Sequence, residues 1–171
     1  MKSHSYSVLL TALAFLLFSA CINAMQPTPL PAALQLTGIQ GQVVKAGDLP
    51  SQGHWLMIYV TPGSHFCQNM LKLLTKQDYP NLAPNSVIIV GGSIDDVKTL
   101  ASKYPDLTAA SWYADTGQNA FGLLKLHGLP TVLGIDQQTM EWTVNGVAPD
   151  AATFKSVLNS WLEQPSVAAK P

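Results

Sequence analysis

The apolar run over residues 55–60, Trp-Leu-Met-Ile-Tyr-Val, is the feature that most constrains how this chain folds. It shows no alternation between apolar and polar positions, and its length suits a strand that is buried on both faces. Residues 87–90 and 132–135 form two further runs of the same kind. Strands of this type need helices packed above and below them. The sequence therefore predicts a central sheet covered on both sides.

The segments between these runs carry helical and hairpin patterns. Ser93 is a suitable N-cap, with Asp95 and Asp96 in the first helical turn behind it. Gly128 is placed to end a short helix. The expected helices are 64–76, 93–103, 120–126 and 150–161; the expected strands are 112–114, a hairpin over 36–49, and a hairpin made by 132–135 and 141–144. The predicted fold class is α/β, with a central mixed β-sheet flanked by helices on both faces.

The N-terminal residues read as an export signal. Lys2 precedes an apolar stretch at 8–18, and Ala24 offers a cleavage site, so we expect a signal peptide over 1–24 and a periplasmic protein. Two alternatives stay open. Residues 18–21, Phe-Ser-Ala-Cys, resemble a lipobox that would make Cys21 the lipidated first residue, or the signal segment is retained as an anchor. We expect membrane contact only in those two cases.

The rest of the chain reads as one domain. Residues 25–35 carry three prolines and are expected to form an extended, mobile, proline-rich lead-in. The domain is expected over 36–163, followed by a flexible tail over 164–171. This length is enough for one ordinary domain with its own hydrophobic core.

Charge and cysteine content exclude some function classes. The formal net charge is −1, and removal of Lys2 with the signal gives −1 − 1 = −2. The chain contains no arginine and no basic run, so a nucleic-acid partner is not expected. Its cysteines are Cys21 and Cys67. Cleavage after Ala24 leaves Cys67 alone, which excludes an internal disulfide in the mature protein.

Two short strings next to the apolar runs read as halves of one site. Residues 61–68, Thr-Pro-Gly-Ser-His-Phe-Cys-Gln, follow the first run and open a helix; residues 128–131, Gly-Leu-Pro-Thr, precede another run. This layout resembles the thioredoxin fold. Over residues 36–162 the chain is similar to exported thioredoxin-like proteins of the TlpA/ResA type, since Asp-x-Gly-x-x-Ala at 115–120, Ile-Asp at 135–136 and Asn-Gly at 145–146 follow in the order typical of that group.

The resemblance implies roles for particular residues. Leu129, Pro130 and Thr131 would form a cis-proline loop that lies against the start of the first helix. The motif Ser64, His65, Phe66, Cys67 would stand where the family has Cys-x-x-Cys, so it is degenerate.

Two departures from the family pattern bear on activity. Ser64 falls on the exposed nucleophilic cysteine and Cys67 on the buried resolving one. A serine hydroxyl cannot form a disulfide, although it makes a good N-cap. The buried acid of thioredoxin would fall at Ile58, which cannot accept a proton.

Three function classes remain open. The first is a non-catalytic exported module that binds a protein or peptide at this edge, as an accessory of an assembly system such as a conjugation or secretion machine. The second is a thiol-disulfide oxidoreductase or isomerase that acts through Cys67. One form of this reading is an alternative alignment in which Cys67 is the nucleophile and Met70 stands in place of the second cysteine. The third is a copper-handling protein that uses Cys67, His65, His127 and Met70. The first reading needs no cofactor and no metal.

Overall fold

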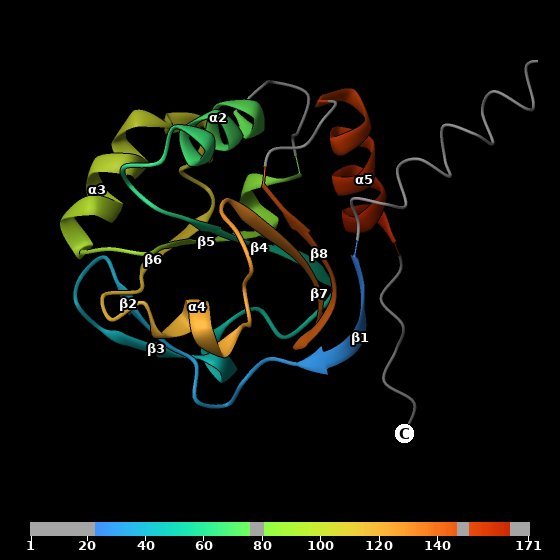
Figure 1. Ribbon diagram of the computed structural model, residues 1–171, viewed down its shortest axis with the longest axis horizontal. Coiled ribbons are helices and arrows are strands. Elements are labelled where there is room, and N and C mark those ends of the chain that lie inside the picture. The colour runs from blue at the N-terminus through green and yellow to red at the C-terminus, as the bar shows by residue number, and fades with distance from the viewer. Residues whose placement is uncertain (1–22, 76–80, 147–150, 165–171) are drawn as a thin grey trace, which may run out of the picture.

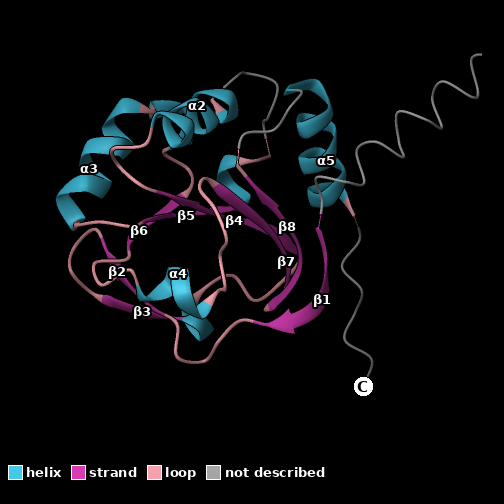
Figure 2. Cartoon of the chain, in the orientation of Figure 1, coloured by secondary structure: helices cyan, strands magenta, loops and turns pink. Residues whose placement is uncertain are grey.

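A computed structural model describes residues 23–75, 81–146 and 151–164, with the side chains from residue 26 onward. The predictions made for residues 1–22, for the first residue of the last helix and for most of the tail lie outside this part. The described strands form one eight-stranded sheet in the order β1-β8-β7-β4-β5-β6-β2-β3 (Figures 1 and 2). Their bounds are β1 Asn23–Pro29, β2 Gln35–Gly38, β3 Val43–Lys45, β4 His54–Val60, β5 Ser86–Val90, β6 Ser111–Ala114, β7 Thr131–Asp136 and β8 Thr139–Asn145.

Helices cover both faces of this sheet, as Figure 1 shows. On one face, α2 (His65–Leu74), α3 (Ile94–Lys103) and α5 (Ala151–Glu163) pack over a core that contains Ile58 and Val132. On the other face, α4 (Asn119–Leu123) and the segment 30–49 pack over a second core that contains Tyr59 and Leu133. Three short 3-10 helices are η1 Ala46–Asp48, η2 Ala83–Asn85 and η3 Pro105–Leu107.

The predicted α/β class, with a mixed sheet and helices on both faces, is confirmed. Strand β4 is wholly buried apart from its first residue, and it pairs in parallel with β5 and antiparallel with β7. Within the described chain, no helix is long and apolar enough to cross a bilayer.

Two elements differ from the prediction. Helix α4 ends at Leu123 rather than near residue 126, because Lys125 takes a left-handed conformation with φ of 52° and turns the chain out of the helix. The proline-rich lead-in is also more ordered than expected, since residues 23–29 form β1 on the outer edge of β8. Proline lacks a backbone N–H, and an edge strand tolerates this because one side of its backbone needs no partner.

The carboxyl ends of three parallel strands define one edge of the sheet. Val60 of β4 pairs with Val90 of β5, and Val90 pairs with Ala114 of β6. The next residues stay side by side, because the Gly91 N–H donates to the Val60 carbonyl at 2.8 Å and the Asp115 N–H donates to the Val90 carbonyl at 2.8 Å. We call this the carboxyl edge, and it carries the loops that form the candidate site.

Candidate functional site

Helix α2 begins at the carboxyl edge, directly behind β4. Ser64 is its N-cap, with extended backbone angles, and its hydroxyl accepts a hydrogen bond from the Cys67 N–H at 3.3 Å. The Ser64 carbonyl accepts the first helical bond from the Gln68 N–H at 3.0 Å. Both interactions satisfy backbone groups that a helix end otherwise leaves without a partner. Ser64 therefore has a complete structural role at the position closest to the helix N-terminus.

Cys67 lies one helical turn deeper and points into the core. Its side chain is 1% exposed and packs in the same cluster as Met70 and Val132. Thr61 contacts the sulfur from the end of β4: its N–H donates to Sγ at 3.4 Å, and its hydroxyl oxygen lies 3.8 Å from Sγ. The sequence did not single out Thr61, because a residue in a turn before the motif carries no signal for such a contact.

The loop before β7 lies at the same edge of the sheet, beside the end of β4. Thr131 pairs with Tyr59 of β4, so the preceding Pro130 runs beside the last residue of that strand. The Leu129–Pro130 peptide bond is cis. The Thr131 hydroxyl donates to the Gly128 carbonyl at 2.5 Å and lies 2.9 Å from Oδ1 of Asn145, and the Gly146 N–H donates to the Pro130 carbonyl at 2.7 Å. Strand β8 thus fixes this loop from the far side.

The residues between Ser64 and Cys67 face outward. Phe66 is 61% exposed, which is unusual for a large apolar side chain in this protein, and its ring packs edge-on against that of His65 at a centroid distance of 6.4 Å. His65 is exposed and Nδ1 lies 3.2 Å from the Asn69 amide nitrogen. The surface at the start of α2 therefore carries one exposed aromatic ring beside a histidine, and residues 61–68 and 128–131 contain no acidic side chain, lysine or arginine.

A buried polar pair supports the edge from beneath. The Tyr59 hydroxyl donates to Oδ2 of Asp115 at 2.8 Å, and the Ala120 N–H at the start of α4 donates to the same oxygen at 3.0 Å. Burial, followed by the hydrogen bond to Asp115, raises the pKa of Tyr59 far above its ordinary value. The family resemblance had suggested only that residues 115–120 follow a typical order; the structure shows that Asp115 joins β4, β6 and α4.

The copper ligand set proposed from the sequence is not assembled as one cluster. Met70 is 1% exposed in the core, whereas His65 and His127 are exposed. Among the described residues, no three His, Cys, Asp or Glu side chains lie together in a way that could hold a metal ion.

Comparison with known proteins establishes the fold. No protein-family model and no curated protein sequence matches the chain. A putative thiol:disulfide interchange protein DsbE from Chlorobium tepidum matches with a TM-score of 0.64 and 17% identity, over 81% of this chain and 96% of that one. A secreted Mycobacterium tuberculosis disulfide oxidoreductase homologous to E. coli DsbE matches with a TM-score of 0.61 and 16% identity, over 74% and 95%.

A third solved structure belongs to an exposed lipoprotein thioredoxin from Streptococcus pneumoniae. It matches with a TM-score of 0.54 and 14% identity, over 74% of this chain and 98% of that chain. The chain therefore has the thioredoxin-like fold, and its structural neighbours include thiol-disulfide oxidoreductases. At these identities the likeness describes the fold alone, so the activity must be argued from the site.

Proposed function

We propose that this protein is an exported thioredoxin-like module of the TlpA/ResA type whose Cys-x-x-Cys motif has degenerated to Ser64–Cys67, and that it binds a protein or peptide without catalysing thiol exchange. The observation that carries the proposal is that Ser64 occupies the helix N-cap, with Cys67 buried behind it. In a dithiol enzyme an exposed thiolate at this helix end is the attacking group.

Three features that thiol-disulfide exchange needs are missing here. The exposed position carries a hydroxyl, which cannot form a mixed disulfide. The only thiol among the described residues is 1% exposed, so a partner's disulfide cannot reach it in the folded state. The strand position that supplies the buried acid in thioredoxin holds Ile58, which is fully buried in the apolar core. The alternative register, in which Cys67 attacks and Met70 replaces the second cysteine, places both sulfurs in the core.

The surface that remains suits binding. Exposed Phe66 and the partly exposed Leu129 lie at the edge where thioredoxin-like proteins meet extended substrates. An exposed aromatic residue supplies much contact area at a low entropic cost, which makes it a good anchor for a partner. The expected export signal fits a periplasmic location, and the structural neighbours include a secreted protein and a lipoprotein. We further infer that the partner is itself exported, for example as a component of an assembly machine such as a conjugation or secretion system.

An insulin-reduction assay tests the absence of exchange. The exported protein, incubated with insulin and dithiothreitol, should not accelerate insulin precipitation over dithiothreitol alone, because no mixed disulfide can form at Ser64. Turnover comparable to that of a dithiol thioredoxin would establish the second reading, an oxidoreductase acting through Cys67.

The variant Ser64→Cys tests the register. It should form an intramolecular disulfide with Cys67 under oxidising conditions, seen as a loss of two mass units and of both free thiols. The control Gln68→Cys places a thiol one residue beyond Cys67, on a different side of α2, and should not form that disulfide. If Ser64→Cys stays reduced, the proposed correspondence with Cys-x-x-Cys is wrong.

A further inference from the structure

A buried histidine joins the start of β4 to the end of α5. The side chain of His54 is 5% exposed, whereas His65 and His127 are exposed. Its Nδ1 lies 3.0 Å from the carbonyl oxygen of Gln164, the residue that follows α5, and its ring packs edge-on against Trp161 at a centroid distance of 4.2 Å. His54 therefore links the sheet to the last turn of this helix, away from the candidate site.

The contact with Gln164 determines which ring nitrogen of His54 carries a hydrogen. A carbonyl oxygen can only accept, so Nδ1 is the donor. A neutral imidazole has one N–H, and Nε2 is then left without a hydrogen and can only accept. Nε2 becomes a donor when the ring takes up a second proton, which histidine side chains do between about pH 5 and 8.

The atom opposite Nε2 is an acceptor that lacks a donor. His54 pairs with Asp136 of β7 across the sheet, and Nε2 lies 3.9 Å from Oδ1 of that carboxylate. This Oδ1 is the one buried side-chain oxygen or nitrogen atom of the described residues that has no hydrogen-bond partner. A buried acceptor without a donor is costly. A proton on Nε2 would supply the missing donor, with the two atoms about 1 Å from the distance of a charge-assisted hydrogen bond.

The charges around the ring do not oppose a second proton. Within the described chain, Asp136 is the one acid at ion-pair distance from His54; Glu163 at the end of α5 is exposed, and Glu141 of β8 is partly exposed. The last turn of α5 contains no basic residue, and η2 and β5, which follow the sheet next to β4, contain no ionisable side chain. His54 is thus placed to supply the positive charge that a helix C-terminus favours.

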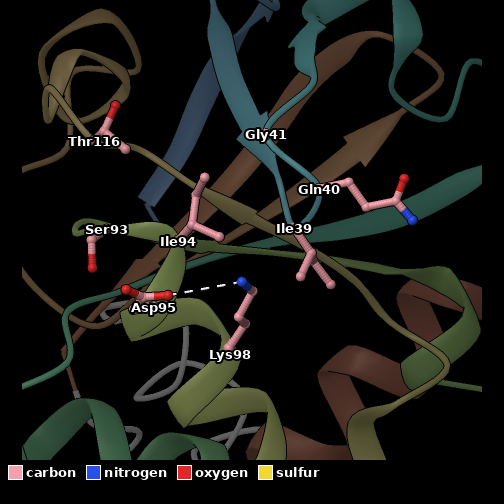
Figure 3. A pocket seen from close by; sticks show the side chains of 8 residues that line it. All are labelled: Ile39, Gln40, Gly41, Ser93, Ile94, Asp95, Lys98 and Thr116. Carbon is pink, nitrogen blue, oxygen red and sulfur yellow. Dashed lines mark ion pairs between the residues drawn. The ribbon is translucent and has the colours of Figure 1, made fainter.

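Burial distinguishes this pair from an ion pair on the surface of α3. In Figure 3 a dashed line joins Asp95 to Lys98, beside a pocket between the β2–β3 hairpin and α3; the charged atoms are 3.8 Å apart. Their side chains are 92% and 56% exposed, so water solvates both charges. The side chains of His54 and Asp136 are 5% and 17% exposed, and each charge depends on the other.

We propose that His54 is a proton-dependent latch that fastens the end of α5 to the sheet. With two protons on the ring, Nδ1–H donates to the Gln164 carbonyl and Nε2–H donates to Oδ1 of Asp136, so the ring joins α5, β4 and β7. When Nε2 returns its proton to the solvent, the Asp136 carboxylate loses its donor and the helix end loses its positive charge. The latch is therefore closed at acidic pH and loosened as the pH rises.

This latch is independent of the proposed function. His54 is the first residue of β4, whereas Ser64 and Phe66 follow the end of that strand. The two lie at opposite ends of the sheet, and the latch involves neither the cis-proline loop nor Cys67.

Nitrogen-15 chemical shifts of the histidine rings test the protonation of the unmodified protein. At pH 5 both ring nitrogens of His54 should be protonated, and at pH 8.5 the remaining proton should be on Nδ1. His65 is the internal control, because the Asn69 amide nitrogen lies 3.2 Å from its Nδ1 and, as a donor, places the proton of the neutral ring on Nε2. A His54 ring that is neutral at pH 5, or that keeps its proton on Nε2 at pH 8.5, would overturn the latch.

Amide hydrogen exchange tests whether the proton fastens the helix. After correction for the intrinsic pH dependence of exchange, the amides of residues 161–163 should be protected about tenfold more strongly at pH 5.5 than at pH 8.5. His54→Gln, which is neutral at both pH values, should lose this difference. Asp136→Asn should lose it too, because an amide group can donate to a neutral Nε2, and this variant decides the question if His54→Gln does not fold.

The matched control is Asp95→Asn, which removes the carboxylate of the exposed pair and should leave the tenfold difference in α5 unchanged. The amides at the end of α3, which has Lys103 in its last turn, should show no such difference in any variant. If the difference persists in both His54→Gln and Asp136→Asn, another group controls the helix end and the latch is wrong. If the ring gains its second proton but the protection of α5 stays constant, the proton does not fasten the helix and the latch is equally wrong.

Discussion

At the scale of single residues, two side chains at the start of α2 have structural roles. A hydroxyl at Ser64 accepts a backbone N–H and keeps the helix end satisfied, whereas a thiolate there would be free to attack. Cys67 then behaves as a small apolar core residue with one N–H contact to its sulfur. In the proposed function, the serine at this position is one of three features that separate the architecture of the site from thiol exchange.

Cys67 should therefore react slowly while the protein is folded. We expect iodoacetamide at neutral pH to label native Cys67 at least about a hundredfold more slowly than the urea-unfolded protein, because labelling must wait for the site to open. Cys67→Ala should lower the free energy of unfolding by about 1–2 kcal/mol through lost packing, measured by urea denaturation. Rapid labelling of the native protein, monitored by mass spectrometry, would contradict this and favour the oxidoreductase reading.

The Tyr59–Asp115 pair should make stability depend on alkaline pH. Burial and Asp115 raise the pKa of folded Tyr59 above the ordinary value of 10.0. The stabilisation is then fully present below pH 10 and is lost as the pH rises toward the folded pKa, because the unfolded tyrosine ionises first. Above pH 10 the free energy of unfolding should fall with a slope that is steeper than in Tyr59→Phe, by up to about 1.4 kcal/mol per pH unit. If the free energy of unfolding has the same pH slope in the wild-type protein and in Tyr59→Phe from pH 9 to 11.5, Tyr59 does not titrate in this way.

At the scale of elements, strands β7 and β8 show how closely the sheet and α5 are packed. Gly134 on β7 pairs with Trp142 on β8, and a Cβ at Gly134 would overlap the indole ring. That indole packs edge-on against Trp161 of α5 at a centroid distance of 5.6 Å. The absence of a side chain at Gly134 is therefore what lets Trp142 lie flat on the sheet beneath the last helix.

Gly134→Ala should consequently be costly. We expect a loss of about 1–3 kcal/mol in the free energy of unfolding, because Trp142 must move and disturb its contact with Trp161. The control is Gly122→Ala in α4, where an added Cβ meets no atom within 4 Å and alanine favours the helix. Thermal denaturation of both variants checks the prediction. If Gly134→Ala melts at the same temperature as the wild-type protein, the β7–β8 packing adapts to a methyl group.

The elements that sequence predicted well are those with strong local signals. Unbroken apolar runs indicated β4, β5 and β7, and Ser93 with two acidic residues behind it indicated the start of α3, where the structure has a capping box. Strand β1 escaped prediction because its pairing with β8 depends on residues far away in the sequence. The bulge in β8, which turns Met140 and Trp142 toward opposite cores, could not be predicted for the same reason.

The same division applies to the site. The motif residues could be chosen because they follow a strand and open a helix. The contacts of Thr61 with Cys67 and of Asn145 with Thr131 could not be predicted, because both come from the ends of neighbouring strands.

At the scale of the whole molecule, β1 links the processing of the chain to the completeness of its sheet. Asn23 pairs with Thr143 and Ala24 with Trp142. Cleavage after Ala24 would remove both pairs, whereas processing at Cys21 would keep them. The strand also continues into Leu30, whose N–H donates to the Gln138 carbonyl at 2.8 Å, so its later half stays attached in either product.

Amide hydrogen exchange should distinguish the two products. We expect the amides of β8 around Trp142 and Thr143 to exchange at least about tenfold faster in a chain that begins at Met25 than in one that begins at Cys21, because the outer edge of β8 opens to water there. Amides of β4, in the middle of the sheet, provide the control and should not differ. Equal exchange at β8 would mean that residues 23 and 24 do not hold this edge.

The direction of β1 determines which edge of the sheet would face the membrane if the chain were lipidated. Its first residue lies beside Thr143, two residues from Asn145, which contacts Thr131 next to the cis-proline loop. One residue, Ile22, separates Cys21 from this strand. A chain acylated at Cys21 would thus be attached to the membrane at the end of the sheet that carries Phe66, through a linker of about 4 Å. The edge proposed to bind a partner would then face the lipid surface. Its partners would be the membrane-proximal segments of other proteins, rather than proteins that diffuse freely.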